Sequence, residues 1–178
     1  MRNIELKARL PNRERAIRIC KEMSGARFEG DIRQTDTYFK VPKGRFKLRV
    51  CEPGETYLVY YERKDATEAK GSDYHIEFVR ASVRDVLDRA LGTIAEVRKV
   101  RTLYLWENVR IHLDRVEELG DFIEFEAVLR HSNTEEEGYR KVAELKSLFG
   151  IENTDLIEGS YLEMVNPISA SHEKTVAP

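Results

Sequence analysis

The sequence predicts an antiparallel α+β fold in which roughly eight strands form a closed or nearly closed barrel with helices packed outside it. Short turns join most of the expected strands as hairpins. Several strands alternate charged with apolar residues at a period of two, which places the two kinds of side chain on opposite faces. One face carries almost only charged residues, so we expect a charged barrel interior. The clearest segments are Asn3–Arg9, Arg45–Val50, Lys99–Arg101, Arg110–Asp114 and Glu124–Glu126.

Turn residues delimit the elements of the first half of the chain. A strand over 2–10 precedes a helix that opens at Pro11-Asn12, runs to about Met23 and ends at Ser24-Gly25. Further strands are predicted over 27–40, 45–51, 57–64 and 74–79, separated by turns at 41–44 and 52–55 and by a loop at 65–72.

The second half continues the same pattern. Ser82 and Asp85 suggest a capping box for a helix that ends near Leu91. The acidic first turn of the helix predicted over 133–149 complements its dipole. Strands are predicted over 96–106, 109–116 and 122–130, followed by the helix over 133–149 and a short helix over 155–165. We therefore expect a single domain over residues 1–165 and a disordered tail over 166–178.

Composition excludes several classes of protein. Charged residues make up 35% of the 178 residues, against roughly 25% in an average globular protein. The net charge of −2 lacks the basic excess of nucleic-acid binders. There is no apolar run of membrane-spanning length and no apolar core of a signal peptide near the N-terminus. Cys20 and Cys51 lack zinc-site spacing, so we expect reduced thiols in a cytoplasmic protein without nucleic-acid or membrane partners.

The hairpin turns predict which charged side chains face each other. A turn at Pro42-Lys43 puts Asp36 opposite Arg49, and a turn at Glu107-Asn108 puts Arg101 opposite Asp114. A slip of two residues in either hairpin would change the partners but keep the faces.

The hairpin over 117–121 gathers carboxylates. The expected register puts Asp114 opposite Glu124 and His112 opposite Glu126, with Glu5 on the same inner face. Like charges directly opposite each other are destabilising, and they persist where an Arg, a raised pKa or a metal compensates them. Such oxygen ligands suit Mg²⁺ or Mn²⁺. The competing interpretation, an exposed face of surface salt bridges, leaves the regular apolar alternation of the other face unexplained.

The inward-facing cations require an anion between them. A polyphosphate carried with a divalent metal fits both halves of the interior, and the lack of a P-loop motif means that side chains would hold it. His112 has two interpretations, a structural hydrogen bond to Glu126, which we favour, or a role as metal ligand or base. Tyr38 is expected to pack or to donate to phosphate. The cations are Lys7, Arg9, Lys47, Arg49, Lys99 and Arg101, with Arg45 and Arg110 as further candidates.

These segments resemble the CYTH family, the triphosphate tunnel metalloenzymes, over roughly residues 2–165. The family hallmark is an E-x-E-x-K strand, to which Asn3–Lys7 corresponds. The resemblance implies an eight-stranded antiparallel tunnel that binds a triphosphate with Mg²⁺ or Mn²⁺. The other matching motifs are Gln34–Phe39, Lys47–Arg49, Lys99–Arg101, His112–Glu126 and Glu158–Tyr161.

The pattern is most similar to the class IV adenylate cyclase-like branch, which implies conversion of ATP to cyclic AMP and pyrophosphate. The alternatives are a triphosphatase for tripolyphosphate, thiamine triphosphate or a nucleoside triphosphate, and a non-catalytic polyphosphate-binding module. Whether the chain forms a homodimer stays open. By this resemblance the expected metal ligands are Glu5, Asp114, Glu124 and Glu126, the catalytic residues Glu5, Lys7, Asp114 and Arg101, and the substrate-binding residues Lys7, Arg9, Lys47, Arg49, Lys99, Arg101 and Tyr38.

Three positions depart from the family pattern. Asn3 stands where the hallmark has its first Glu, and an amide brings an oxygen but no charge. Glu62 falls where cyclases place a lumen lysine, although the turn before this strand leaves open whether Glu62 or Arg63 faces inward. Ser72-Asp73 replaces a usual Ser-Arg pair. These departures suggest a tunnel suited to a different triphosphate.

Overall fold

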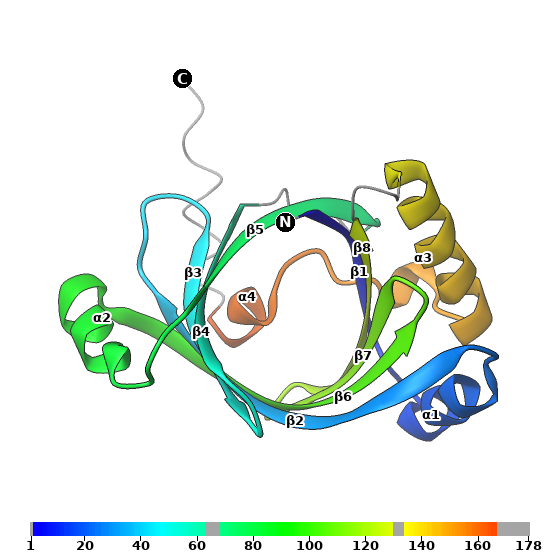
Figure 1. Cartoon of the computed structure of the whole chain (residues 1–178), viewed down its shortest axis with the longest axis horizontal. Coiled ribbons are helices and arrows are strands. Elements are labelled where there is room, and N and C mark those ends of the chain that lie inside the picture. Colours follow the sequence, from blue (N-terminus) through cyan, green and yellow to red (C-terminus); the bar gives the residue numbers. More distant parts are fainter. Residues whose placement is uncertain (1, 63–67, 130–133, 167–178) are drawn as a thin grey trace.

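Eight strands form a closed antiparallel barrel in the computed structural model, which describes residues 2–62, 68–129 and 134–166 (Figure 1). Around the barrel the order is β1-β5-β4-β3-β2-β6-β7-β8. The predicted fold class is confirmed. The strands are β1 (Arg2–Arg9), β2 (Ala26–Phe39), β3 (Arg45–Glu52), β4 (Thr56–Glu62), β5 (Lys70–Phe78), β6 (Thr93–Trp106), β7 (Val109–Val116) and β8 (Gly120–Leu129).

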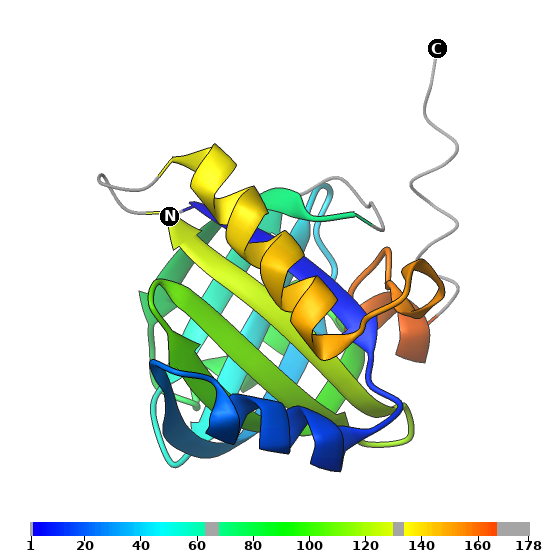
Figure 2. The ribbon, with the colours of Figure 1, turned by 90° about the vertical axis from the view of Figure 1, so that its right-hand side faces the viewer.

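Two longer helices cover the outer wall. Helix α1 (Arg13–Glu22) packs against β2, and α3 (Glu135–Phe149) lies across β1 and β8 (Figure 2). A reciprocal capping box between Thr134 and Glu137 starts α3. Helix α2 (Val83–Leu91) projects from the side of the barrel (Figure 1). The capping box expected at its start is wrong, because Ser82 has helical φ and ψ and its side chain makes no cap bond.

The hydrophobic core lies outside the barrel, between its wall and these helices. Ile4, Ile111 and Phe125 are fully buried there, together with Val142 of α3 and Cys20 of α1. The apolar halves of the alternating strands therefore point outward under α1 and α3, and the charged halves point inward. Within the described residues no helix has the length and apolarity needed to cross a membrane. Both cysteines are free.

Two of the three predicted hairpin registers are confirmed. Asp36 pairs with Arg49 and Arg101 with Asp114. In the third, His112 pairs with Glu124 and Asp114 with Phe122, two residues away from the prediction.

The cause of this shift is a tighter turn. Glu118 and Gly120 adopt positive φ angles of 63° and 94°, which lets the chain reverse sooner. Residues 120 and 121 consequently belong to β8 instead of the turn.

The C-terminal part of the described chain also differs from expectation. The helix predicted over 155–165 is a 3₁₀ turn, Asn153–Asp155, followed by the separate helix α4 (Tyr161–Val165). Between them Leu156 bridges to Ala8, and the Ile157 amide donates to the Lys7 carbonyl, so this stretch is held extended along β1. Of the predicted tail, residues 167–178 lie outside the described residues.

Candidate functional site

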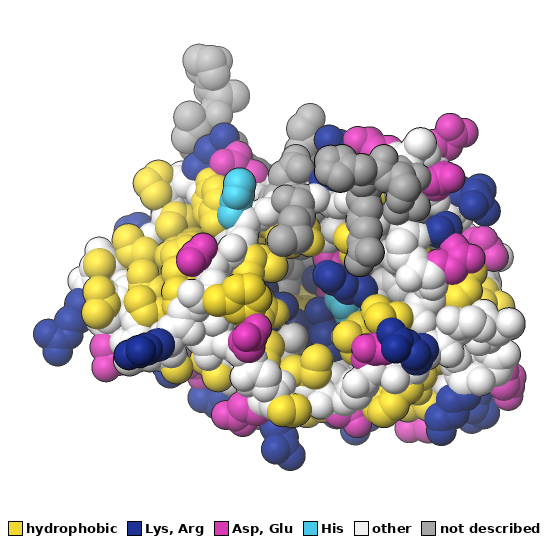
Figure 3. All heavy atoms as spheres, in the orientation of Figure 1, with side chains coloured by type: hydrophobic (Ala, Val, Ile, Leu, Met, Phe, Trp, Pro, Cys, Tyr) yellow, Lys and Arg dark blue, Asp and Glu magenta, His cyan; other side chains and the backbone are white. Residues whose placement is uncertain are grey.

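A cavity of about 490 Å³ occupies the barrel interior. Figure 3 shows its opening as a hollow with Lys, Arg and His side chains inside and hydrophobic side chains around the edge. At the opposite end α4 closes the barrel, where Tyr161 and Leu162 pack with Phe122 and Val97. The polar residues that line the cavity are Asn3, Glu5, Lys7, Gln34, Lys47, Arg49, Glu55, Ser72, Lys99, Arg101, Arg110, His112, Glu124, Glu126 and Ser160, with Tyr38, Tyr57, Tyr61, Tyr74 and Tyr161.

A buried aspartate organises the cations of β3. Both oxygens of Asp36 accept from Arg49, at 2.6 Å each, and Oδ2 also accepts from Lys47 Nζ at 2.8 Å. Asp36 is fully buried. This fork-to-fork geometry fixes the guanidinium plane as well as its charge.

A second aspartate repeats the arrangement across β6 and β7. Asp114, also fully buried, accepts two bonds of 2.7 Å from Arg101 and one of 3.0 Å from Tyr161 Oη. Lys99 Nζ lies 3.4 Å from the same carboxylate. Each Lys-x-Arg strand is thus anchored by an aspartate on its neighbour. The alternative of an exposed salt-bridge face is wrong, because Lys99 and Arg101 are almost completely buried.

Burial and crowding shift the pKa values of these groups. Burial would raise the pKa of Asp36, but the charges of Arg49, Lys47 and Lys99 outweigh it and hold that pKa well below its usual range. Burial, with the charge of Arg49 adding to it, lowers the pKa of Lys47 to about 8. Burial and Arg101 likewise lower the pKa of Lys99. An anion bound between these two lysines would raise their pKa values again, because it favours the charged ammonium form.

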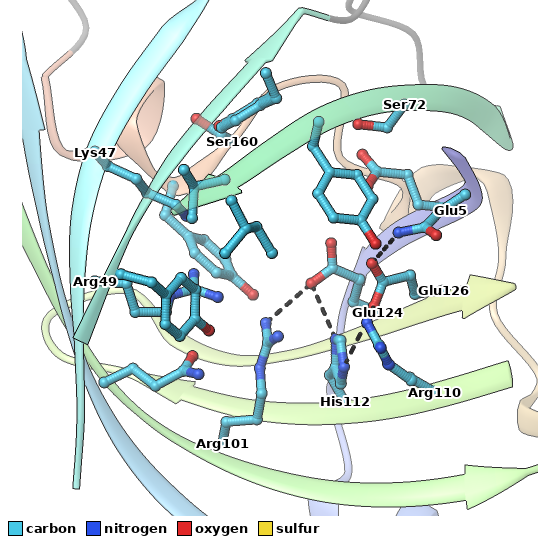
Figure 4. A pocket seen from close by; sticks show the side chains of 18 of the residues that line it. Glu5, Lys47, Arg49, Ser72, Arg101, Arg110, His112, Glu124, Glu126 and Ser160 are labelled. Carbon is cyan, nitrogen blue, oxygen red and sulfur yellow. Dashed lines mark hydrogen bonds and ion pairs between the residues drawn. The ribbon is translucent and has the colours of Figure 1, made fainter. Parts of the chain in front are cut away.

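The carboxylates line the wall made by β1 and β8 (Figure 4). Glu124 lies 3.5 Å from Lys7 Nζ and accepts from Arg101 at 3.0 Å. Burial would raise the pKa of Glu124, but Lys7, His112 and Arg101 keep it well below its usual range. Glu126 accepts from Arg110 at 3.2 Å and from the side-chain amide of Asn3.

His112 lies between the two glutamates. Its Nδ1 is 3.4 Å from Glu124 and its Nε2 is 3.8 Å from Glu126, so the predicted bond to Glu126 is replaced by a closer contact with Glu124. The two-residue shift of the β7–β8 register explains the change. Burial, followed by the charge of Arg101, lowers the pKa of His112 and so favours the neutral ring.

The acidic wall has the oxygen chemistry of a Mg²⁺ or Mn²⁺ site. Glu5, Glu124 and Glu126 line one side of the cavity, and Asn3 Oδ1 is buried there without a hydrogen-bond partner among the described residues. Among those residues no three Asp, Glu, His or Cys side chains converge as a ready-made metal cluster. The donors fit a divalent ion that also takes oxygen ligands from a bound anion.

Several expected residues lie outside this cavity wall. Arg9 is exposed and stacks over the Phe122 ring, 5.5 Å from its centroid. Arg45 pairs with Glu163 at 2.7 Å. Asp114 is not among the lining residues, because its register partner is Phe122 and its oxygens bind Arg101 and Tyr161.

The ambiguity in β4 is also resolved. Tyr57, Val59 and Tyr61 face the cavity, whereas Glu62 is exposed and pairs with Lys43 at 2.7 Å. Arg63 lies outside the described residues.

Two residues that shape the site were not assigned from the sequence. Asp36 was placed opposite Arg49 but given no role, although an aspartate facing the Arg of a Lys-x-Arg strand recurs in the Arg101–Asp114 hairpin. Gln34 lines the cavity and is almost completely buried. A glutamine at an inward position of a strand whose inner face is otherwise charged or apolar gives only a weak signal.

Comparison with known proteins settles the family. The model of the CYTH domain matches residues 1–161. This chain belongs to the CYTH domain family. A Methanocaldococcus jannaschii protein named "Putative adenylate cyclase" is 22% identical over 173 residues, which cover 92% of this chain and 98% of that protein.

Solved structures agree with this membership. A Pyrococcus horikoshii OT3 protein superposes with a TM-score of 0.81 at 28% identity, covering 92% of this CYTH chain and 99% of that chain. A Hippeastrum protein, described as a "putative adenylyl cyclase" with a dominant triphosphatase activity, has a TM-score of 0.63 at 16% identity and covers 99% of this chain and 98% of its own. At that identity the second likeness shows the fold alone.

Proposed function

We propose that this chain is a metal-dependent enzyme that acts on a triphosphate held in the barrel cavity. The observation that carries the proposal is the convergence of cations from four strands, most of them buried, on one cavity that also has an acidic wall. Two aspartates hold the cations of β3 and β6, and the glutamates of the acidic wall pair with the others. A polyphosphate carried with a divalent ion fits both sets, because the phosphate oxygens bind the cations and the ion binds the carboxylates. The cavity cations are Lys7, Lys47, Arg49, Lys99, Arg101 and Arg110.

The reaction we place first is that of a class IV adenylate cyclase, with ATP as substrate. The ribose 3′ oxygen forms a bond to the α-phosphorus, the bond from that phosphorus to the bridging oxygen breaks, and pyrophosphate leaves with the electron pair. The hydroxyl proton passes to solvent. Lys47, Arg49 and Lys99 would stabilise the leaving pyrophosphate by charge and position. Support comes from the apolar side chains at the cavity mouth, which suit the organic part of a nucleotide.

Mg²⁺ or Mn²⁺ would be held by Glu5, Glu124 and Glu126. When bound, the ion would neutralise charge on the phosphate oxygens. In this proposal Asp114, which we expected among the ligands, instead positions Arg101.

Hydrolysis of a triphosphate is the second candidate. Here water attacks the terminal phosphorus, the bond from that phosphorus to the bridging oxygen breaks, and the diphosphate part of the substrate leaves with the electron pair. The products are orthophosphate and a diphosphate, and the protons of the water pass to the orthophosphate and to solvent. The description of the Hippeastrum structure favours it, and the same cations would serve. The third candidate, a binding module without turnover, loses one of its motives because Glu62 does not face the cavity.

Incubation with ATP and Mn²⁺ or Mg²⁺, followed by chromatography of the products, distinguishes the three. Cyclic AMP with pyrophosphate is the expected result. ADP or orthophosphate without a cyclic product would assign the chain to the triphosphatases. Stabilisation by ATP without any turnover would leave the binding module.

A matched pair of variants ties the activity to the cavity. Glu124→Gln removes a carboxylate of the acidic wall and should abolish turnover, whereas Glu144→Gln makes the same change on the exposed side of α3 and should leave turnover unchanged. Equal activity of both variants would place the reaction elsewhere.

A further inference from the structure

Gln34 marks the boundary between two parts of the cavity wall. Along β2 its inward neighbours are Asp36, which binds Arg49 and Lys47, and Ile32 on the side of the cavity mouth. The mouth continues with Leu103 of β6, and with Tyr57 and Phe78 of β4 and β5. Gln34 therefore lies where a charged cavity floor meets an apolar rim.

The amide of Gln34 has one end engaged and one end unpartnered. Its Nε2 lies 3.6 Å from Sγ of Cys51, its partner across the β2–β3 pair, and donates to that sulfur. Its Oε1 is buried and accepts no hydrogen bond from the described residues. The residue is only 5% exposed, and it forms part of the cavity wall.

The neighbouring cations do not use the Gln34 oxygen either. Arg49 donates to Asp36 and Arg101 donates to Asp114 and Glu124. An unsatisfied buried acceptor is costly. A triphosphate chain does not relieve that cost, because its ionised oxygens only accept hydrogen bonds.

We infer that Gln34 accepts a hydrogen bond from a hydroxyl group carried by the organic part of the substrate, and so selects a hydroxyl-bearing triphosphate ester over inorganic tripolyphosphate. The inference rests on the proposed function, because the proposed function places the phosphates on the cations of the cavity floor, deeper in the barrel than Gln34. The adjoining apolar rim, Ile32, Leu103 and Tyr57, would then contact the rest of the organic group. A sugar hydroxyl next to the phosphates has the required chemistry.

Titration calorimetry with the full chain tests this inference. The ligands are ATP, 2′-deoxy-ATP, 3′-deoxy-ATP and tripolyphosphate, in EDTA so that no metal-dependent turnover occurs. Gln34→Met keeps the length of the side chain but removes the acceptor. We expect this variant to bind ATP about 10-fold to 100-fold more weakly than the wild type does, with tripolyphosphate affinity unchanged.

The deoxynucleotides identify the hydroxyl. The deoxynucleotide that lacks the hydroxyl bound by Gln34 should bind the wild type as weakly as ATP binds Gln34→Met. Its affinity should not fall further in the variant, because the hydrogen bond is already missing. Unchanged tripolyphosphate binding also shows that the variant keeps its folded cavity. Thr35→Val, one residue along on the outer face of β2, is the control and should alter neither ligand.

Two results would overturn the inference. If Gln34→Met weakens tripolyphosphate as much as ATP, the amide nitrogen faces the cavity and donates to phosphate. If Gln34→Met binds both ATP and tripolyphosphate as tightly as the wild type does, Gln34 makes no hydrogen bond to the substrate. A wild-type protein that binds none of these triphosphates, with or without Mg²⁺, contradicts the proposed function itself.

Discussion

At the scale of single residues, Asp36 compensates the cations of β3. It is fully buried and accepts three hydrogen bonds of 2.6–2.8 Å from Arg49 and Lys47. Removing one partner of a buried ion pair leaves uncompensated charge. We expect Asp36→Asn to lower the free energy of unfolding by about 3–5 kcal/mol, measured by urea denaturation.

Asp121→Asn is the matched control, because Asp121 pairs with the exposed Arg115 and surface pairs contribute little. If Asp36→Asn only leaves Arg49 and Lys47 uncompensated, bound tripolyphosphate should restore the lost free energy of unfolding. A smaller recovery would mean that the fold itself is damaged. A loss no larger than that of the control would show that Arg49 and Lys47 do not depend on Asp36.

Lys47 makes triphosphate binding sensitive to pH. In the free protein, burial and then Arg49 lower its pKa to about 8, so the ammonium is present below that pH and lost above it. A bound triphosphate favours the charged form and raises this pKa. Binding should therefore take up a proton, and affinity should fall as pH rises from about 7 to about 9.

Titration calorimetry in buffers of different ionisation enthalpy measures this proton uptake. Lys47→Arg keeps its charge throughout the range and should flatten the dependence. Proton uptake in the variant equal to that of the wild type would assign the titration to another group.

At the scale of elements, α3 approaches the barrel closely through Gly138. A Cβ there would lie 2.9 Å from Ile4 Cγ1 and 3.2 Å from Leu129 Cδ2, and Ile4 is fully buried. Alanine improves helix propensity by about 1 kcal/mol, but overpacking costs about 1–3 kcal/mol. Gly138→Ala should therefore reduce the free energy of unfolding by about 1 kcal/mol.

Ser147→Ala, on the exposed side of the same helix, should by contrast leave stability equal or slightly higher. Urea denaturation of both variants makes the comparison. A stabilising Gly138→Ala would mean that α3 stands further from β1 than the structure indicates.

Sequence periodicity predicted the strands and their two faces better than it predicted which residues pair across neighbouring strands. The alternation of Ile111, Leu113 and Phe125 with charged residues was enough to assign the two faces, because a two-residue slip keeps every side chain on its side. For the same reason the alternation could not distinguish the true register of the β7–β8 hairpin from one shifted by two residues. Only the positive φ angles of Glu118 and Gly120 decide it, and Glu118 carries no such signal in the sequence.

At the scale of the whole molecule, a net charge of −2 conceals a strong separation of charge. The barrel interior places a track of cations opposite an acidic wall, while the apolar faces pack under α1 and α3. The sequence predicted both sets. The sequence placed Asp114 opposite Arg101, but it could not predict that Asp114 would also bind Tyr161 and stay out of the acidic wall. That outcome depends on the β7–β8 register and on α4 closing one end of the barrel.

The most direct test of the central claim is a crystal structure of the protein soaked with a non-hydrolysable ATP analogue and Mn²⁺. The account predicts the triphosphate inside the barrel between the Lys47–Arg49 and Lys99–Arg101 strands, with Mn²⁺ at the wall of Glu5, Glu124 and Glu126. A triphosphate bound outside the barrel, or a cavity left empty at saturating ligand, would contradict it.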